Sequence, residues 1–209
     1  MGRYLGSKCK FCRREGVKLF LKSERCFSSK CPIGKKRALP PGQHGVRGRR
    51  RISNYGVQLR EKQKLKRLYG VGEKQLKRYL NQSLKKKGGT AGALLQFLET
   101  RLDNVVCSLG FVPSRSMARQ LVSHGHILVD GKKVNIPSVN LRPGQTISLS
   151  SDALNFVYVR KSLADKNRKI PAWLEKKAAV GRLSRLPGRE EVKVDVNVDE
   201  NLVVEFYSR

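Results

Sequence analysis

The sequence predicts an α+β fold in three parts: a metal-pinned N-terminal arm, a helical domain, and an inserted module of two helices on a small antiparallel sheet. Three observations predict it. Four of the five cysteines lie within residues 1–39. Leucines recur at the spacing of an amphipathic helix over residues 55–100. Over residues 101–149, two helical patterns precede short alternating segments around an Asp-Gly pair, a strong hairpin signal.

The cysteines of the arm form two close pairs. Two residues separate Cys9 from Cys12, four separate Cys26 from Cys31, and thirteen lie between the pairs. Four thiolates at this spacing predict a tetrahedral structural zinc site, closed and without metal chemistry. Disulfides, unliganded thiols and an iron–sulfur cluster remain alternatives, although a reducing cytosol disfavours disulfides and zinc is preferred to the cluster.

A basic loop is predicted at residues 40–54, because Pro and Gly interrupt it and no apolar periodicity remains. The helical domain is predicted to combine residues 55–100 with an irregular C-terminal tail at 150–209, which contains short helical and strand pieces. Its first helix covers residues 59–69 and ends at Gly70, since glycine suits a helix C-terminus.

A second helix of this domain has leucines on one face and cations outside: Leu76, Leu80 and Leu84, and Lys74, Lys77 and Arg78. A third helix starts near Thr90, a good N-terminal residue. Leu94, Leu98 and Leu102 continue its apolar stripe, so this helix is expected to run with a break into the module.

The module at residues 101–149 begins with a helix whose apolar residues recur at i, i+3, i+4 and i+7. Ser114 is expected to cap the next helix, on which Arg115 and Arg119 lie one turn apart and are expected to point outward. Asp130-Gly131 then turns a hairpin, and a further strand completes a small sheet that needs the helices as a covering layer.

The net charge of +29 dominates the chemistry of the chain. Residues 1–90 hold 27 Lys and Arg against 4 Asp and Glu, and residues 91–209 hold 18 against 12. Solubility needs a net charge of only about 2–8, so the excess predicts a polyanionic partner. No apolar run approaches the roughly 18 residues of a membrane span, and the N-terminus lacks a secretory apolar core. We therefore expect a cytoplasmic protein without a membrane partner.

The predicted polyanion is a nucleic acid, recognised mainly by shape and backbone, because aromatic residues make up only 7% of the chain. The candidate RNA-binding residues carry a positive charge or an imidazole and lie in the arm, the loop, the first helix and the module: Arg3, Arg13, Arg14, His44, Arg47, Arg49, Arg50, Arg51, Arg60, Lys62, Lys64, Lys66, Arg67, Arg115, Arg119, His124, His126, Lys132 and Lys133. A merely solvated helix face and simple packing of the histidines are the alternatives.

Several motifs resemble the bacterial ribosomal S4 protein family, and they follow one another along nearly the whole chain. They are Pro41-Gly-Gln-His-Gly45, Tyr55-Gly-Val-Gln-Leu-Arg-Glu-Lys-Gln-Lys-Leu65, Arg101-Leu-Asp-Asn-Val-Val106, Ala118-Arg-Gln-Leu-Val-Ser-His-Gly-His126 and Val204-Glu-Phe-Tyr-Ser-Arg209. The module itself resembles the S4-type RNA-binding domain. A small departure is Ser138-Val-Asn140, where the family usually has an aromatic residue after the serine.

The resemblance implies a structural, non-catalytic constituent of the small ribosomal subunit. It implies direct binding to the 5′ domain of 16S rRNA, nucleation of subunit assembly and an effect on translational accuracy. It also implies a place beside ribosomal protein S5 at the mRNA entry channel, with Arg47, Arg49 and Arg50 as candidates for mRNA contact. No small-molecule substrate is expected.

Two other classes of protein are alternatives. The first is an RNA-modifying enzyme that carries an S4-type module, which is disfavoured because the sequence offers no nucleophile or acid/base pair in a pocket-like context. The second is a transcription factor with a zinc arm, which would be expected to show a recognition-helix motif.

Overall fold

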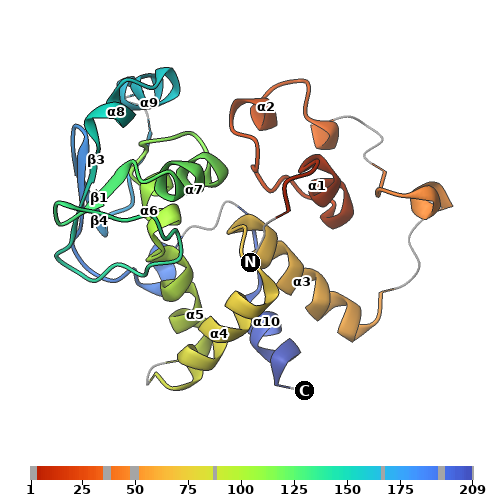
Figure 1. Cartoon of the computed structure of the whole chain (residues 1–209). Coiled ribbons are helices and arrows are strands. Elements are labelled where there is room, and N and C mark those ends of the chain that lie inside the picture. Colours follow the sequence, from red (N-terminus) through yellow and green to blue (C-terminus); the bar gives the residue numbers. More distant parts are fainter. Residues whose placement is uncertain are drawn as a thin grey trace. The chain divides into compact units, whose positions relative to one another are not determined.

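The computed structural model of the chain describes residues 4–34, 39–47, 52–86, 89–165, 168–192 and 196–208. The chain forms two compact units, residues 1–94 with 194–209, and residues 95–193 (Figure 1). The observed helices and strands make the α+β class that the sequence predicts. None of the helices in the described ranges is long and apolar enough to cross a membrane.

The first unit is helical, as predicted for residues 55–100. Its elements are α1 (Cys9–Glu15), α2 (Glu24–Phe27), α3 (Asn54–Leu68), α4 (Glu73–Leu84), α10 (Glu200–Tyr207), two short 3-10 helices (Pro32–Gly34 and Gln43–Arg47) and the beginning of α5 (Thr90–Glu99). The helix α3 begins before the predicted start at residue 59, because the Ser53 hydroxyl accepts a hydrogen bond from the Gly56 amide at 3.2 Å.

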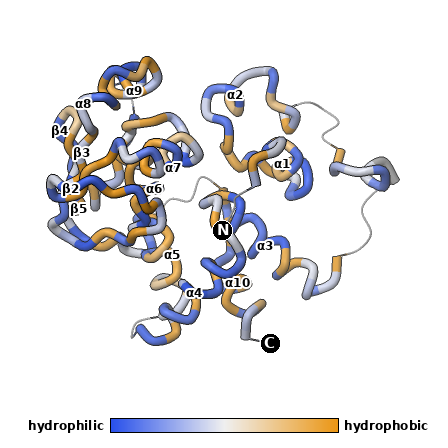
Figure 2. Tube along the Cα trace, viewed as in Figure 1, coloured by the Kyte–Doolittle hydropathy of each residue, from blue (hydrophilic) through white to orange (hydrophobic). Residues whose placement is uncertain are grey.

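The helices of the first unit differ in how much of their surface is apolar. Figure 2 shows mostly hydrophilic residues along α3 and mostly hydrophobic ones along α5. Leu65 and Leu68 of α3 and Leu76 of α4 are fully buried, whereas Val57 of α3 and Leu84 of α4 are exposed. The C-terminal helix α10 packs against α3, where the rings of Tyr55 and Phe206 are 5.5 Å apart.

The second unit contains the predicted module. Its elements are α6 (Leu102–Ser108), α7 (Arg115–Ser123), β1 (Ile127–Val129), β2 (Lys132–Lys133), β3 (Thr146–Leu149), α8 (Ser151–Leu154), α9 (Val157–Ala164), β4 (Leu174–Lys177), β5 (Val180–Leu183), a 3-10 helix (Arg189–Glu191) and the end of α5. The strands form one antiparallel sheet in the order β2-β1-β3-β5-β4. The prediction of two helices with a small antiparallel sheet is confirmed.

The hairpin between β1 and β2 turns at Asp130-Gly131, as predicted. Both residues have positive φ, 49° and 77°, which is the backbone of a type I′ turn. The Asp130 carboxylate also accepts hydrogen bonds from the Thr146 amide at 2.8 Å and from the Gln145 side chain at 2.8 Å. The turn therefore ties the hairpin to the start of β3.

The β4–β5 hairpin was not located by the sequence, which indicates only unspecified strand pieces in the tail. It turns at Ala178, whose φ of 51° is unusual for an alanine, and no Gly or Asn marks the turn. Because β5 pairs with β3, residues 150–193 belong to the second unit, and only residues 194–209 lie with the first. This differs from the predicted division, which placed the whole tail at 150–209 in the helical domain.

The core of the second unit lies among α6, α7 and the sheet. Phe111, Leu109, Ile147 and Trp173 are among its fully buried side chains. Leu109 lies so close to the backbone of β5 that a Cβ added at Gly181 would stand 2.4 Å from the Leu109 Cδ1 atom. The two predicted helices thus pack on a sheet that is wider than the module predicted from the sequence.

Candidate nucleic-acid interface

The five cations predicted to bind RNA from the first helix all lie on α3, and each forms an ion pair with a carboxylate in the described part of the chain. The pairs are Arg60 and Arg67 with Glu15, Lys62 and Lys66 with Glu73, and Lys64 with Glu61. The sequence placed these side chains on a polar helix face. In the structure four of them pair with carboxylates of α1 and α4, and Lys64 pairs with Glu61 of α3 itself.

Glu15, the last residue of α1, accepts hydrogen bonds from two of these arginines. Its side chain is fully buried, and Nη1 of Arg60 lies 3.3 Å from its Oε1 atom, which also accepts from Arg67. Burial raises the pKa of Glu15, while the charges of Arg67 and Arg60 oppose this rise. The contact fastens the cysteine arm to α3.

Glu73, the first residue of α4, connects three helices. Lys62 and Lys66 of α3 donate to its carboxylate at 2.8 and 2.9 Å, and Tyr207 of α10 donates at 2.6 Å. Burial alone would raise the pKa of Glu73, but the hydrogen bonds from Lys62, Tyr207 and Lys66 lower it to about 2. Lys62 also lies 4.3 Å from the centre of the Phe206 ring. These contacts stabilise the first unit, and RNA binding by the α3 cations stays a prediction.

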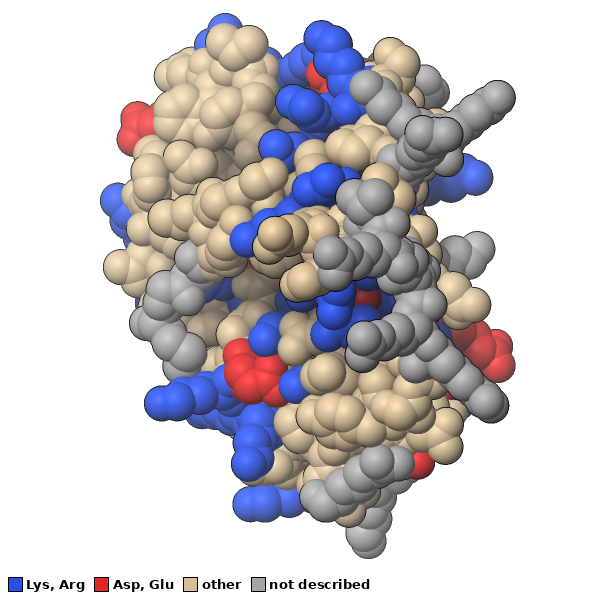
Figure 3. Space-filling model, turned by 90° about the vertical axis from the view of Figure 1, so that its right-hand side faces the viewer, with Lys and Arg blue, Asp and Glu red and all other residues tan. Residues whose placement is uncertain are grey.

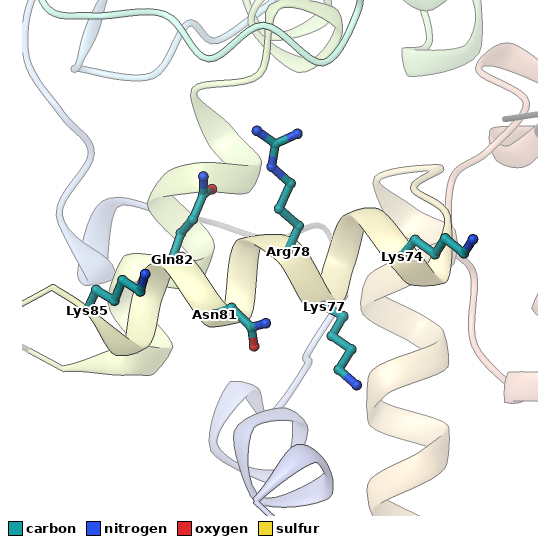
Figure 4. A pocket seen from close by; sticks show the side chains of 6 residues that line it. All are labelled: Lys74, Lys77, Arg78, Asn81, Gln82 and Lys85. Atoms are coloured by element: carbon teal, nitrogen blue, oxygen red, sulfur yellow. The ribbon is translucent and has the colours of Figure 1, made fainter.

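The polar face of α4 carries a different set of cations, which were not among the sequence candidates. Lys74, Lys77, Arg78 and Lys85 are exposed, and together with Asn81 and Gln82 they line a shallow depression of about 360 Å³ (Figure 4). Within the ranges that the structure describes, none of the four cations has an ion-pair partner. The sequence already placed Lys74, Lys77 and Arg78 outside this helix, and their spacing of three and four residues was the signal that could have added them to the candidates.

The arginines of α7 are held by α6 rather than projecting freely as expected. Arg115 Nε donates to Asn104 Oδ1 at 2.7 Å, and Arg119 Nη1 lies 3.3 Å from Asp103 Oδ2. Asp103 is buried and also accepts two hydrogen bonds from the buried Arg101, at 2.9 and 2.6 Å. Both α7 arginines are half-buried, so a phosphate would meet guanidinium groups that are already oriented.

The histidines of the module lie in a row of rings at the end of α7. The His124 and His126 rings are 6.3 Å apart, the His126 ring meets Phe156 edge-on at 5.0 Å, and Phe156 stacks on Tyr158 at 5.5 Å. The sequence did not indicate this row, because its members come from separate segments.

Lys132 and Lys133 are exposed on β2, as expected for a hairpin that contacts a polyanion.

The remaining RNA candidates are in the arm and the loop. Arg14 and His44 are exposed, and Arg13 is half-buried. Arg3, Arg49, Arg50 and Arg51 lie outside the described residues, as does the side chain of Arg47. Figure 3 shows one face of the molecule on which Lys and Arg side chains gather, with a few small groups of Asp and Glu among them.

The four cysteines of the arm share one neighbourhood. Cys12, Cys26 and Cys31 are buried and Cys9 is half-buried, and all are free thiols. Burial raises the pKa of Cys12, and the neighbouring Cys26, Cys9 and Cys31 raise it further. Among the described residues, however, no group of three or more His, Cys, Asp or Glu side chains has an arrangement that could hold a metal ion. The predicted metal-pinned arm is therefore not supported as a formed site.

Comparisons with known proteins cover the whole chain. Residues 3–99 match the family described as ribosomal protein S4/S9 N-terminal domain, and residues 100–147 match the S4 domain. The chain is 51% identical to small ribosomal subunit protein uS4 of Thermus thermophilus, and 53% and 54% identical to the proteins of that name in Dictyoglomus turgidum and Dictyoglomus thermophilum, each with 100% of both chains covered. The chain therefore belongs to the uS4 family of small ribosomal subunit proteins.

Proposed function

We propose that the chain is a structural RNA-binding protein of the small ribosomal subunit in the cytoplasm, and that it binds the 5′ domain of 16S rRNA and nucleates assembly. The observation that carries this proposal is the identity of 51–54% over the full length to proteins that bear the name of that subunit. The net charge of +29 supports a polyanionic partner. An RNA-modifying enzyme gains no support from these relatives, which are named as ribosomal proteins.

The test of this function is binding of the full-length protein to a transcript of the 16S rRNA 5′ domain. We expect affinity to fall steeply with salt, by about 10³ to 10⁵ between 50 and 200 mM if 6–10 phosphates are contacted. Hydroxyl-radical footprinting on full-length 16S rRNA should show protected backbone in the 5′ domain only. Equal affinity for an unrelated RNA of the same length, or an affinity that salt leaves unchanged, would contradict the proposal.

A finer part of the proposal is the place in the subunit. The chain lies beside ribosomal protein S5 at the mRNA entry channel and affects translational accuracy, with Arg47, Arg49 and Arg50 as the candidates for mRNA contact. Support comes from the resemblance of the motifs and from the charge of this loop, which carries arginine residues and no carboxylate between residues 40 and 54.

The arm is proposed to bind one Zn²⁺ through Cys9, Cys12, Cys26 and Cys31, with an iron–sulfur cluster as the less favoured occupant. Four soft thiolate donors suit zinc. Burial raises the pKa of Cys12 and repulsion from the other three thiols raises it further, and a bound cation would offset both. When bound, the metal supplies a cross-link between the two cysteine pairs. The chain's own contact between Glu15 and the α3 arginines would hold the arm in addition.

Removal of the metal should loosen the arm alone. Treatment with a chelator is expected to raise amide hydrogen exchange in residues 4–34 while the second unit keeps its protection, because the cysteine pairs lie only in the arm. Cys9→Ser should have the same effect, and Cys107→Ser, which changes a buried cysteine outside the arm, should retain the metal. Freshly purified protein without zinc or iron in elemental analysis would refute the site.

A further inference from the structure

The polar face of α4 is the feature from which the inference starts. Its six members recur every three or four residues: Lys74, Lys77, Arg78, Asn81, Gln82 and Lys85. At about 1.5 Å per residue, this stripe is roughly 16 Å long. In Figure 4, Arg78 and Gln82 leave the helix on one side and Lys77 and Asn81 on the other, so that they form the two edges of the shallow depression.

The cations of α4 differ from those of α3 in what surrounds them. Each α3 cation already has a carboxylate partner, whereas Lys74, Lys77, Arg78 and Lys85 pair with none of the described carboxylates. The nearest acidic residue in sequence, Glu73, is held by Lys62, Lys66 and Tyr207. Four exposed charges without a carboxylate partner in the described ranges are available to an external anion.

The helix presents this stripe on a fixed support. On the opposite face Leu76, Tyr79, Leu80 and Ser83 are buried, and the Ser83 hydroxyl donates to the Tyr79 carbonyl at 2.8 Å. A stripe on a packed helix loses little conformational freedom of the backbone when a ligand binds. The site therefore needs no folding step.

The chemistry of the lining indicates the ligand. Four positive charges over roughly 16 Å suit a chain of phosphates better than a single anion. The amides of Asn81 and Gln82 both donate and accept hydrogen bonds, as ribose hydroxyls and base edges require. The lining contains no aromatic side chain, so stacking of bases is not its function.

We propose that the exposed stripe of α4 binds one strand of the RNA sugar-phosphate backbone, while the paired cations of α3 hold the helices of the first unit together. The inference rests on the proposed RNA-binding function and deepens it by naming the site. Contact through Lys and a single Arg on one helix face recognises the position of phosphates rather than base sequence.

The test compares two variants of the full-length protein on the transcript of the 16S rRNA 5′ domain. Lys77→Gln/Arg78→Gln removes two charges from the stripe. The control Lys169→Gln/Lys177→Gln removes two exposed charges elsewhere in the chain that pair with no carboxylate in the part that the structure describes. The stripe variant should reduce the slope of log affinity against log salt by about 2, roughly 1 for each lost phosphate contact. It should also lose one segment of backbone protection, while the control keeps the wild-type slope.

The outcomes separate this inference from the function on which it rests. Loss of salt-dependent binding by the wild-type protein would refute the function itself. The α4 site would be overturned if the wild-type protein binds as expected but the stripe variant has the same slope of log affinity against log salt. It would also be overturned if the control variant changes that slope as much as the stripe variant does. The charge-preserving variant Lys77→Arg/Arg78→Lys should restore the slope, and failure to do so with a wild-type melting temperature would also overturn it. Loss of binding to anionic lipid vesicles, with RNA binding unchanged, would assign the stripe to a membrane instead.

Discussion

Replacing Asp103 with Ala is expected to lower the free energy of unfolding of the second unit by about 3–5 kcal/mol. Arg101 is only 1% exposed, and both of its hydrogen bonds to Asp103 would be lost. The buried charge of Arg101 would then lose the carboxylate that it is paired with, which costs more than the ion pair contributes. Chemical denaturation followed by tryptophan fluorescence measures the effect, because the single tryptophan, Trp173, lies in this unit.

The double variant Arg101→Met/Asp103→Ala is the control for this prediction. Removing both charges from a buried pair is often nearly neutral, so the double variant should recover most of the lost stability. Arg119 loses an acceptor in both variants, but its side chain is 27% exposed and water can replace the contact. Equal losses in the single and double variants would show that the charge of Arg101 is not buried against Asp103.

Local signals in the sequence were sufficient to predict much of the fold. The hairpin at Asp130-Gly131 depends on two residues that tolerate positive φ, and the second helix of the module begins where Ser114 accepts a hydrogen bond from the Met117 amide. Such signals act over two or three residues, so a single sequence reveals them. The continuous apolar stripe of Leu94, Leu98 and Leu102 also predicted a helix that runs into the module with a break, and the structure has the break at Thr100 and Arg101.

Contacts between distant residues were not predictable in this way. Glu15 and Arg67 are 52 residues apart, and Tyr207 and Glu73 are 134 apart. A helical pattern shows that the cations of α3 are on a polar face, but not that carboxylates from other helices meet them there. For this reason the candidate RNA-binding residues included the cations of α3. Those of α4 were placed outside their helix but left off the list, and they have no such partners among the described residues.

The β4–β5 hairpin leads to the second large prediction. Replacing Trp173 with Ala is expected to lower the free energy of unfolding of the second unit by about 3–5 kcal/mol, as expected for an indole removed from a packed core. Trp173 is 1% exposed and belongs to the same core cluster as Leu109 and Ile147. Circular dichroism during thermal and chemical unfolding would measure the loss, since this variant lacks the fluorescent reporter.

The position of Trp173 makes this variant a test of how the unit is divided. Its carbonyl accepts a hydrogen bond from the Ser184 amide at 3.1 Å, next to the Leu174–Leu183 pair that joins β4 to β5. If the hairpin completes the core, hydrogen exchange should rise in α6 and β3 as well as in β4 and β5. Val157→Ala, at a side chain that is 81% exposed, should change stability by no more than about 0.5 kcal/mol. If faster hydrogen exchange is confined to residues 174–183, the hairpin does not contribute to the core of the unit, and residues 101–149 are stable without it.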